Sequence, residues 1–206
     1  MLRYRYEILA LTNDADNFCV SQTPLSAGYM ILDGVDASTG NIQAQKIQIT
    51  CFGDETAATF TIVGTNENGQ TQTENITGAN ATQAFSAKYY KTLSSVYIDV
   101  AAADALEVGA AAASGALSPT FYVNTSAAFY ATAAFYSYSG TSSVEYTISD
   151  VMDTSITPVW FPLGAMTGLT GTTTAVAMYN PVCAIRFKVT SGDATSNGTL
   201  EYIQSY

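Results

Sequence analysis

The stretch TFTIVGTNENGQTQTENIT, residues 59–77, decides the fold class of this 206-residue chain. Its first part, Thr59 to Gly64, alternates polar and apolar side chains, as a half-buried strand does. Asn68-Gly69 follows, and this dipeptide readily takes the positive φ values of a tight hairpin turn. Residues 70–76 then supply a second strand. The stretch therefore predicts a β-hairpin.

The same pattern of short strands and turns extends through most of the chain. From Lys46 onward, strand candidates recur roughly every 8–12 residues between clusters of Gly, Pro, Asn, Asp and Ser. The chain has 14 Tyr and 9 Phe but only 12% charged residues, which is a composition typical of strands. We therefore expect an all-β fold of antiparallel sheets, built as β-sandwich or jelly-roll-like modules.

The second half of the chain repeats the first at the level of pattern. A shift of 86 residues aligns the alternating strand pattern of residues 58–62 with that of 144–148. With a shift a few residues longer, 87–89 align with 177–179 and 96–100 with 185–189. Such internal similarity predicts two tandem β-modules.

The predicted modules are separated where the strand pattern stops. Apolar alternation ends at Gly109 and resumes at Thr120, across an Ala- and Gly-rich segment. We therefore expect an extended N-terminal arm over residues 1–45, a first β-module over 46–115 and a second over 116–206. The alternative for residues 1–11 is an ordinary edge strand of the first module.

Charge and hydropathy limit the partners. The chain has 17 acidic against 7 basic residues, a formal charge of -10, which argues against binding nucleic acid through its phosphates. Polar residues interrupt every apolar run, so no membrane span is expected. The three cysteines lack disulfide or metal spacing, which predicts buried, reduced thiols and a protein made in a cytoplasm.

The sequence offers no reactive centre. It contains no histidine, the usual general base and metal ligand, and no nucleophile elbow or phosphate-binding loop. We therefore predict a protein that is not an enzyme and that holds no cofactor or metal. The sequence has four pairs of neighbouring acids: Asp14 with Asp16, Asp33 with Asp36, Asp54 with Glu55, and Asp150 with Asp153. They lie in turn-like segments, where Asp typically accepts hydrogen bonds from backbone N–H groups. The alternative functional interpretations are a pair of glycosidase carboxylates and a calcium site.

Three groups of residues are candidates for an interface. Arg3, Tyr4 and Arg5 concentrate positive charge in the predicted arm, which would clamp a partner surface. Arg186 and Lys188 share one face of a strand, as a contact stripe for an acidic partner or as an ordinary solvated face. Trp160 and Phe161 begin the densest apolar patch, which is either core or an intersubunit contact. The aromatic run 129–138 suggests a sugar platform or, alternatively, core.

Several motifs resemble those of accessory virion proteins of tailed bacteriophages. They are strand and turn patterns spread over most of the chain after residue 20, such as SQTPLSAG (21–28), FTIVGT (60–65), YYKTLSSV (89–96), VEYTISD (144–150) and PVCAIR (181–186). The resemblance carries over no catalytic residue. It implies a structural virion protein that acts through its surfaces.

The first expectation is a capsid decoration or cement protein, made in the bacterial host and located on the virion surface. There it would form a dimer or trimer and clamp neighbouring major capsid subunits. The alternatives are a head-to-tail neck or tail adaptor, a fibre-base or spike protein, and a carbohydrate-binding module of a receptor-binding protein.

Overall fold

In the computed structural model the backbone is described for residues 2–8, 11–111, 115–123, 129–136, 141–153, 155–164, 167, 173–178, 182–191 and 197–204. Every element of regular structure longer than a single turn in these ranges is a β-strand, which confirms the all-β prediction. The chain divides into two compact units. Unit 1 comprises Met1–Ala10 with Leu117–Tyr206, and unit 2 comprises Leu11–Ala116.

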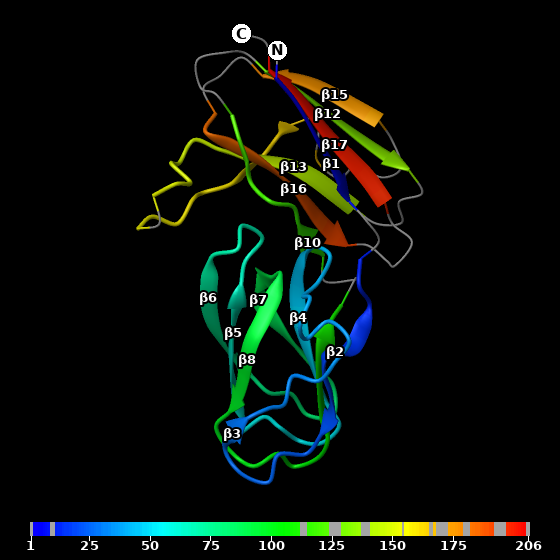
Figure 1. The fold of residues 1–206 in the computed structure, drawn as a ribbon, viewed down its shortest axis with the longest axis vertical. Helices are drawn as coiled ribbons and strands as arrows, with labels where there is room; N and C mark the ends of the chain where they lie inside the picture. The colour runs from blue at the N-terminus through cyan, green and yellow to red at the C-terminus, as the bar shows by residue number, and fades with distance from the viewer. Residues whose placement is uncertain are drawn as a thin grey trace. The chain divides into compact units, whose positions relative to one another are not determined.

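Among its described residues, unit 2 contains eight strands: β2 (Asp14–Gln22), β3 (Gly28–Tyr29), β4 (Ala44–Cys51), β5 (Thr59–Thr65), β6 (Thr71–Thr77), β7 (Gln83–Tyr90), β8 (Thr92–Ile98) and β9 (Leu106–Ala110). They form two sets of hydrogen-bonded neighbours, ordered β7-β4-β9-β2 and β3-β8-β5-β6 (Figure 1). The neighbouring strands in both sets are antiparallel.

In the described part of unit 1 there are also eight strands: β1 (Leu2–Ile8), β11 (Phe121–Tyr122), β12 (Phe129–Tyr136), β13 (Thr141–Thr147), β14 (Phe161–Pro162), β15 (Thr173–Met178), β16 (Ala184–Ser191) and β17 (Asn197–Gln204). Their antiparallel pairs give the orders β15-β12-β17-β1 and β11-β16-β13-β14. The short β10 (Ala116–Leu117) lies where the chain passes from unit 2 back to unit 1.

The strand orders of the two units correspond element by element. In each unit the first strand pairs with the last, and the short second strand pairs with the seventh. The segments matched in the sequence occupy equivalent positions, since β5, β7 and β8 of unit 2 correspond to β13, β15 and β16 of unit 1. The repeat read from the sequence is therefore present in the strand pairing.

The predicted hairpin is confirmed as β5 and β6, which pair from Thr59 opposite Thr77 to Thr65 opposite Thr71. Gly69 has φ +78°, and the side-chain oxygen of Asn66 accepts the N–H groups of Asn68 and Gln70 at 3.0 and 2.9 Å. The turn is held by its own asparagine, as the residue types predict.

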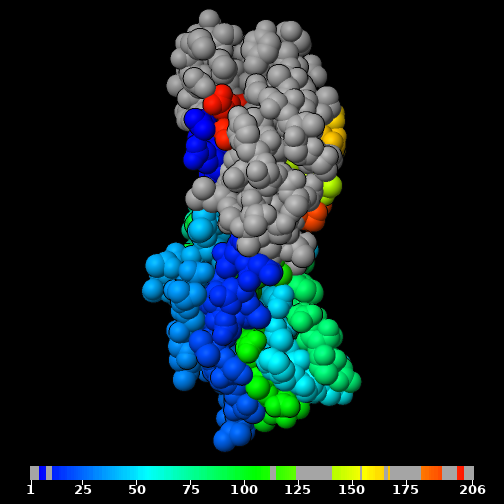
Figure 2. All heavy atoms as spheres, turned by 90° about the vertical axis from the view of Figure 1, so that its right-hand side faces the viewer, coloured from blue at the N-terminus to red at the C-terminus, as the bar shows by residue number. Residues whose placement is uncertain are grey.

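The core of unit 2 lies between its two strand sets. Alternate residues of β5 and β8, among them Phe60, Ile62 and Ile98, are fully buried. They belong to one cluster with Ile49 of β4 and Val108 of β9. In Figure 2 the blue segment at the start of unit 2, which contains β2, lies beside the green segment around β9, as the pairing of β2 with β9 requires. Residues 11–45 therefore help to enclose this core.

Side chains also cover the edge of β6. Glu74 accepts the backbone N–H groups of Ala87 and Lys88 in β7 at 2.6 and 3.1 Å, and Gln72 Nε2 donates to the carbonyl of Tyr89 at 2.6 Å. These bonds tie β6 to β7 of the other set. They occupy polar groups at a sheet edge, where unpaired strands invite aggregation.

Two predictions about chain organisation are wrong. Residues 1–45 are not an extended arm, because residues 2–8 form β1 and pair along their full length with β17 (dark blue beside red in Figure 1). Residues 11–45 supply β2 and β3 to unit 2. The modules are also not in tandem, since unit 2 is inserted in the sequence between the two segments of unit 1, Met1–Ala10 and Leu117–Tyr206.

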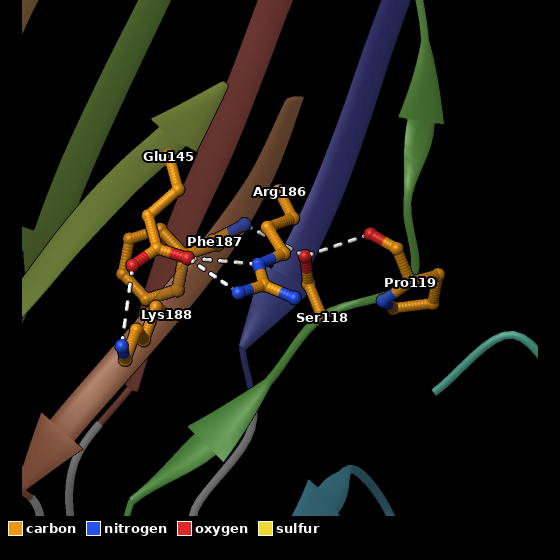
Figure 3. Close-up of polar contacts among 6 residues, drawn as sticks. All are labelled: Ser118, Pro119, Glu145, Arg186, Phe187 and Lys188. Carbon is orange, nitrogen blue, oxygen red and sulfur yellow. Dashed lines mark hydrogen bonds and ion pairs between the residues drawn. The ribbon is translucent and has the colours of Figure 1, made fainter. Parts of the chain in front are cut away.

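The chain re-enters unit 1 next to the boundary expected near residue 115. There Ser118 continues the hydrogen bonding of β16 with both its backbone and its side chain (Figure 3). Its N–H donates to the carbonyl of Phe187 at 3.0 Å, and its Oγ accepts the N–H of Phe187 at 2.9 Å. The hydroxyl donates in turn to the carbonyl of Pro119 at 2.8 Å.

Candidate functional site

Two of the predicted interface residues meet around one carboxylate in unit 1 (Figure 3). The register places Glu145 of β13 opposite Arg186 of β16, with Lys188 two residues farther along. Arg186 donates from Nε and Nη2 to Glu145 Oε2 at 2.8 and 2.7 Å, and Lys188 Nζ lies 3.2 Å from Glu145 Oε1. A single acid therefore holds two cations.

In this ion-pair cluster of Glu145, Arg186 and Lys188, the acid and the arginine are largely shielded from water, whereas Lys188 is half-buried. The side chains of Glu145 and Arg186 are 10% and 13% exposed. The Trp160 ring covers the guanidinium, with 4.1 Å between the ring centroid and Arg186 Cζ. Charged groups removed from water in this way depend on one another, because losing one partner leaves an uncompensated charge. The cluster therefore ties β13, β16 and the segment before β14 together.

The structure changes the roles expected for Arg186 and Lys188. They do share one face of β16, as alternation predicts. They are, however, neither a free positive stripe nor an ordinary solvated face, because both bind Glu145 and Trp160 covers Arg186. Glu145 was missed in the sequence. Its only signal is its position in an alternating strand, and this pattern gives no register.

Trp160 and Phe161 lie in different surroundings. Trp160 stacks on Arg186, whereas Phe161 pairs in register with Tyr146, 5.7 Å away between ring centroids. Phe161 is 42% exposed, whereas Leu163 is buried. The apolar patch expected here is therefore core only at Leu163, and Phe161 remains available at the surface.

The loop between β13 and β14 carries a concentration of exposed apolar side chains. It runs from Ile148 to Trp160, appears in yellow in Figure 1 and projects away from the strands of unit 1. Four of its aliphatic residues are exposed, by 64% at Ile148, 68% at Met152, 43% at Ile156 and 58% at Val159. We refer to these four residues as the apolar loop.

Two acids shape the turns of the apolar loop. Asp150 accepts the N–H of Met152 at 2.9 Å. Asp153 accepts the N–H and the hydroxyl of Ser155 at 2.9 and 2.6 Å, and these bonds lower the pKa of Asp153. The loop thus presents its apolar side chains on turns that its own carboxylates hold.

Acids of the other pairs also accept hydrogen bonds from backbone N–H groups. Asp14 accepts the N–H of Asp16 at 3.2 Å, Asp33 that of Val20 at 3.0 Å, and Asp54 that of Thr56 at 3.2 Å. Glu55 is buried, and its Oε1 accepts the N–H groups of Ala103 and Asp104 at 2.7 and 3.1 Å. Within the described residues no group of three or more His, Cys, Asp or Glu side chains is placed to hold a metal ion.

The predicted basic arm is part of unit 1. Arg5 lies in β1, where its guanidinium is 2.9 Å from Glu7 and 3.8 Å from Glu201 of the neighbouring strand. The backbones of Arg3 and Tyr4 lie in the same strand, and their side chains are outside the described residues, as are those of the aromatic run 129–138. Nearby, Tyr6 packs edge-on against Phe121 at 5.6 Å, and burial raises its pKa to about 12.

Two of the three cysteines lie in the core of unit 2. All three are free thiols, with Cys19 and Cys51 buried as expected and Cys183 half-buried. Burial and then the charge of Asp33 raise the pKa of Cys19 to about 12, so its thiol stays protonated at neutral pH. Cys19 Sγ also lies 2.8 Å from the carbonyl oxygen of Ile31.

No helix in the described part of the chain is long and apolar enough to span a membrane. In comparisons with known proteins, no family model, curated protein or solved structure matches this chain.

Proposed function

We propose that this protein is a structural component of a tailed-bacteriophage virion, which decorates and stabilises the outer capsid by binding neighbouring major capsid subunits. The observation that carries the proposal is the apolar loop of unit 1, Ile148, Met152, Ile156 and Val159. The motifs that resemble accessory virion proteins include VEYTISD (144–150), which leads directly into this loop.

The apolar loop has the properties of a contact site between proteins. Fully burying one aliphatic side chain contributes about 1.5–3 kcal/mol, so the four exposed side chains of one loop together supply a substantial driving force. Asp150 and Asp153 hold the turns before any partner arrives, which lowers the entropy lost on binding. Phe161, 42% exposed at the end of the loop, adds an aromatic side chain of the kind enriched in interfaces.

We further infer that each unit is a jelly roll. The order of its eight antiparallel strands supports this interpretation. The jelly-roll architecture occurs in viral capsid and lectin domains. This likeness is an analogy of fold alone, and it supports the proposal that the chain is a virion protein.

The clamp is assigned to the apolar loop instead of to residues 1–11, since β1 is bound to β17. On the capsid the protein would form a dimer or trimer. The alternative position, at the neck or tail, uses the same contact chemistry but fewer copies.

The test is a count of copies per particle. Virions are purified by density gradient from host cells that carry the gene, and quantitative mass spectrometry compares this protein with the major capsid protein. A copy number comparable to that of the capsid subunits supports decoration. A copy number that corresponds to a single ring of subunits would place the protein at the neck or tail. Absence from the particle overturns the proposal.

A matched pair of variants tests the contact. Met152→Ser with Ile156→Ser removes apolar area from the loop, and Val35→Ser is the control, because Val35 is 76% exposed in unit 2. We expect the loop variant to bind particles at least tenfold more weakly with an unchanged melting temperature, and the control to bind normally. Normal binding by a folded loop variant would show that the loop is not the contact.

A further inference from the structure

The outer side of the β3-β8-β5-β6 set in unit 2 carries a continuous uncharged surface. Tyr29 of β3 lies opposite Tyr97 of β8, Tyr97 opposite Thr61 of β5, and Thr61 opposite Asn75 of β6. Ser95 and Val63 form the next row. We call these six residues the tyrosine face: Tyr29, Thr61, Val63, Asn75, Ser95 and Tyr97.

The tyrosine face has a hollow at its centre. The hollow has a volume of about 200 Å³ and is lined by Tyr29, Thr61, Val63, Ser95 and Tyr97. The two tyrosine rings meet edge-on, with centroids 5.2 Å apart and planes at 68°. The edge of one ring therefore faces the plane of the other. Tyr29 is 74% exposed, so its ring is open to a ligand.

The size of the hollow fits one small ring better than a whole ligand. Pockets for drug-sized ligands usually measure about 300–1,000 Å³, whereas one water molecule takes about 30 Å³. The hollow lies between these limits and is open on the sheet surface. A chain molecule can therefore place one unit in the hollow and continue along the strands.

The polar groups around the hollow are hydroxyls and an amide. Thr61 and Asn75 are hydrogen-bonded to each other at 3.0 Å through the hydroxyl and the amide oxygen, which leaves the amide nitrogen of Asn75 as a donor. The hydroxyls of Tyr29, Ser95 and Tyr97 make no hydrogen bond to the described part of the chain. Such groups both donate and accept, as a ligand rich in hydroxyls requires.

The face is uncharged although the protein carries a net charge of -10. Alternation gives β5 and β6 only uncharged outward residues, mostly threonines: Thr59, Thr61, Val63, Thr65, Thr71, Thr73, Asn75 and Thr77. Ionic groups at its margins are engaged with the backbone, Asp99 with the N–H of Thr59 and Lys88 with the carbonyl of Thr73, both at 2.7 Å. The six residues of the tyrosine face themselves carry no charge with which to select an ionic ligand.

We infer that the tyrosine face binds a neutral polysaccharide, with one sugar ring seated against Tyr29 and Tyr97. A sugar presents apolar C–H faces to an aromatic ring and hydroxyls around its rim, so it matches rings bordered by hydroxyl and amide groups. A protein partner fits this face less well, because Val63 is the only aliphatic side chain among its six residues. The inference rests on unit 2 alone and is independent of the apolar loop and of a place in a virion.

Calorimetric titration of the full-length protein tests the inference. The probes are uncharged hexasaccharides of glucose, mannose, galactose and N-acetylglucosamine, with dextran sulfate as the anionic comparison. We expect at least one neutral hexasaccharide to bind and the binding to persist in 0.5 M NaCl, because no charge is involved. Failure of all four neutral probes, or binding of dextran sulfate alone, overturns the inference.

Variants assign the binding to the face. Tyr29→Ala and Tyr97→Ala should each weaken it at least tenfold, whereas Tyr29→Phe keeps the ring and should stay within about threefold. The matched control is Tyr122→Ala, since Tyr122 is 51% exposed on the equivalent short strand of unit 1. Unchanged glycan binding in both alanine variants overturns the inference. So does a loss of particle binding in these variants without any glycan binding, which would make the face a protein contact.

Discussion

The two units have the same strand order but different surface chemistry on the corresponding sets. In unit 2 the outer side of β3-β8-β5-β6 is the uncharged tyrosine face. In unit 1 the corresponding set, β11-β16-β13-β14, carries Glu145 with its two cations under Trp160. The inner sides of both sets carry buried apolar pairs, Phe60 opposite Ile98 in unit 2 and Val144 opposite Phe187 in unit 1. One face of each strand thus maintains the fold, while the other accepts a different function.

The units also differ in how the chain builds them. Unit 2 is one continuous segment, Leu11–Ala116, whereas unit 1 is assembled from Met1–Ala10 and Leu117–Tyr206. The pairing of β1 with β17 therefore joins residues almost the whole chain apart. Because the entropy of closing a loop grows only slowly with its length, unit 1 should tolerate an unfolded unit 2, but not the loss of β1.

The largest effect is expected from deleting residues 1–8. The deletion removes the complete β1–β17 ladder and leaves β17 without its outer neighbour. It also removes the contact between the rings of Tyr6 and Phe121. We expect unit 1 to lose most of its stability, out of a typical total of about 5–15 kcal/mol, while unit 2 stays folded. Hydrogen exchange with mass spectrometry reports each unit separately, and full protection of β12 and β17 in the deletion variant would restore the idea of a dispensable arm.

The next largest effect comes from the two cores. Phe60 in unit 2 and Phe187 in unit 1 are both buried, and replacing either with Ala should lower the free energy of unfolding by about 3–5 kcal/mol. Each variant should destabilise only its own unit. Phe85→Ala is the control, since Phe85 is 46% exposed and should change stability much less. Chemical denaturation followed by exchange of each unit tests this, and equal loss in both units would show that they unfold together.

A somewhat smaller effect is expected at the ion-pair cluster, which only unit 1 has. Glu145→Ala leaves Arg186 and Lys188 without their carboxylate, and we expect a loss of about 3 kcal/mol. Replacing Glu145 and Arg186 together with Met should restore most of it, because the shielded guanidinium is removed with the carboxylate and only Lys188, whose side chain is 31% exposed, loses its partner. Arg5→Ala breaks an exposed pair and should change stability by less than about 1 kcal/mol. A loss of similar size in the double variant would show that packing, not charge, stabilises this face.

The parts of the fold that the sequence predicts are those that depend on neighbours in the chain. Asn68-Gly69 identifies the β5–β6 turn, and alternation from Thr59 to Gly64 identifies a strand. The acids that shape turns are also local, as at Asp54 and Asp150. Each of these features has its physical cause within a few residues.

The parts that the sequence does not predict depend on distant partners. Residues 2–8 have a strand pattern, but nothing in it identifies β17 as the neighbour. Glu145 likewise requires the register of β13 and β16 before it meets Arg186. Tyr29 belongs to a two-residue strand, too short for any periodic pattern, and its role depends on pairing with Tyr97. Long-range register, rather than strand propensity, places the candidate sites.

A smaller effect, of opposite sign, is expected at Tyr90 in unit 2. Its ring is fully buried, its hydroxyl has no hydrogen-bond partner among the described residues, and burial raises its pKa. An unpartnered buried hydroxyl is destabilising, so Tyr90→Phe should raise the free energy of unfolding by about 1 kcal/mol. Tyr97→Phe, at a half-buried position in the same unit, is the control and should be neutral. A lower stability of Tyr90→Phe in urea denaturation would show that an ordered water binds this hydroxyl.

The smallest effect concerns the acids where β2 pairs with β9. Burial and the charges of Asp16 and Asp14 raise the pKa of Glu107, and the pKa of Asp16 is raised chiefly by its hydrogen bond with Asp14. A carboxyl with a raised pKa binds its proton more tightly in the folded state. Its stabilising contribution is therefore complete below the unfolded pKa and is lost as pH rises through the folded pKa. At neutral pH these acids destabilise unit 2.

Glu107→Gln should therefore stabilise unit 2 at pH 7, by only about 0.5 kcal/mol because Glu107 is half-buried and solvent screens its interactions with the other acids. The gain should disappear near pH 3, where the wild-type acid is protonated, and should shrink in 0.5 M NaCl through screening. Asp54→Asn is the matched control of opposite sign, since hydrogen bonds from Thr56 lower the pKa of Asp54 and its contribution is lost as pH falls. Urea denaturation of both variants at pH 3, 5 and 7 measures the difference. If Glu107→Gln is no more stable than wild type at pH 7, the crowding of these acids does not destabilise unit 2.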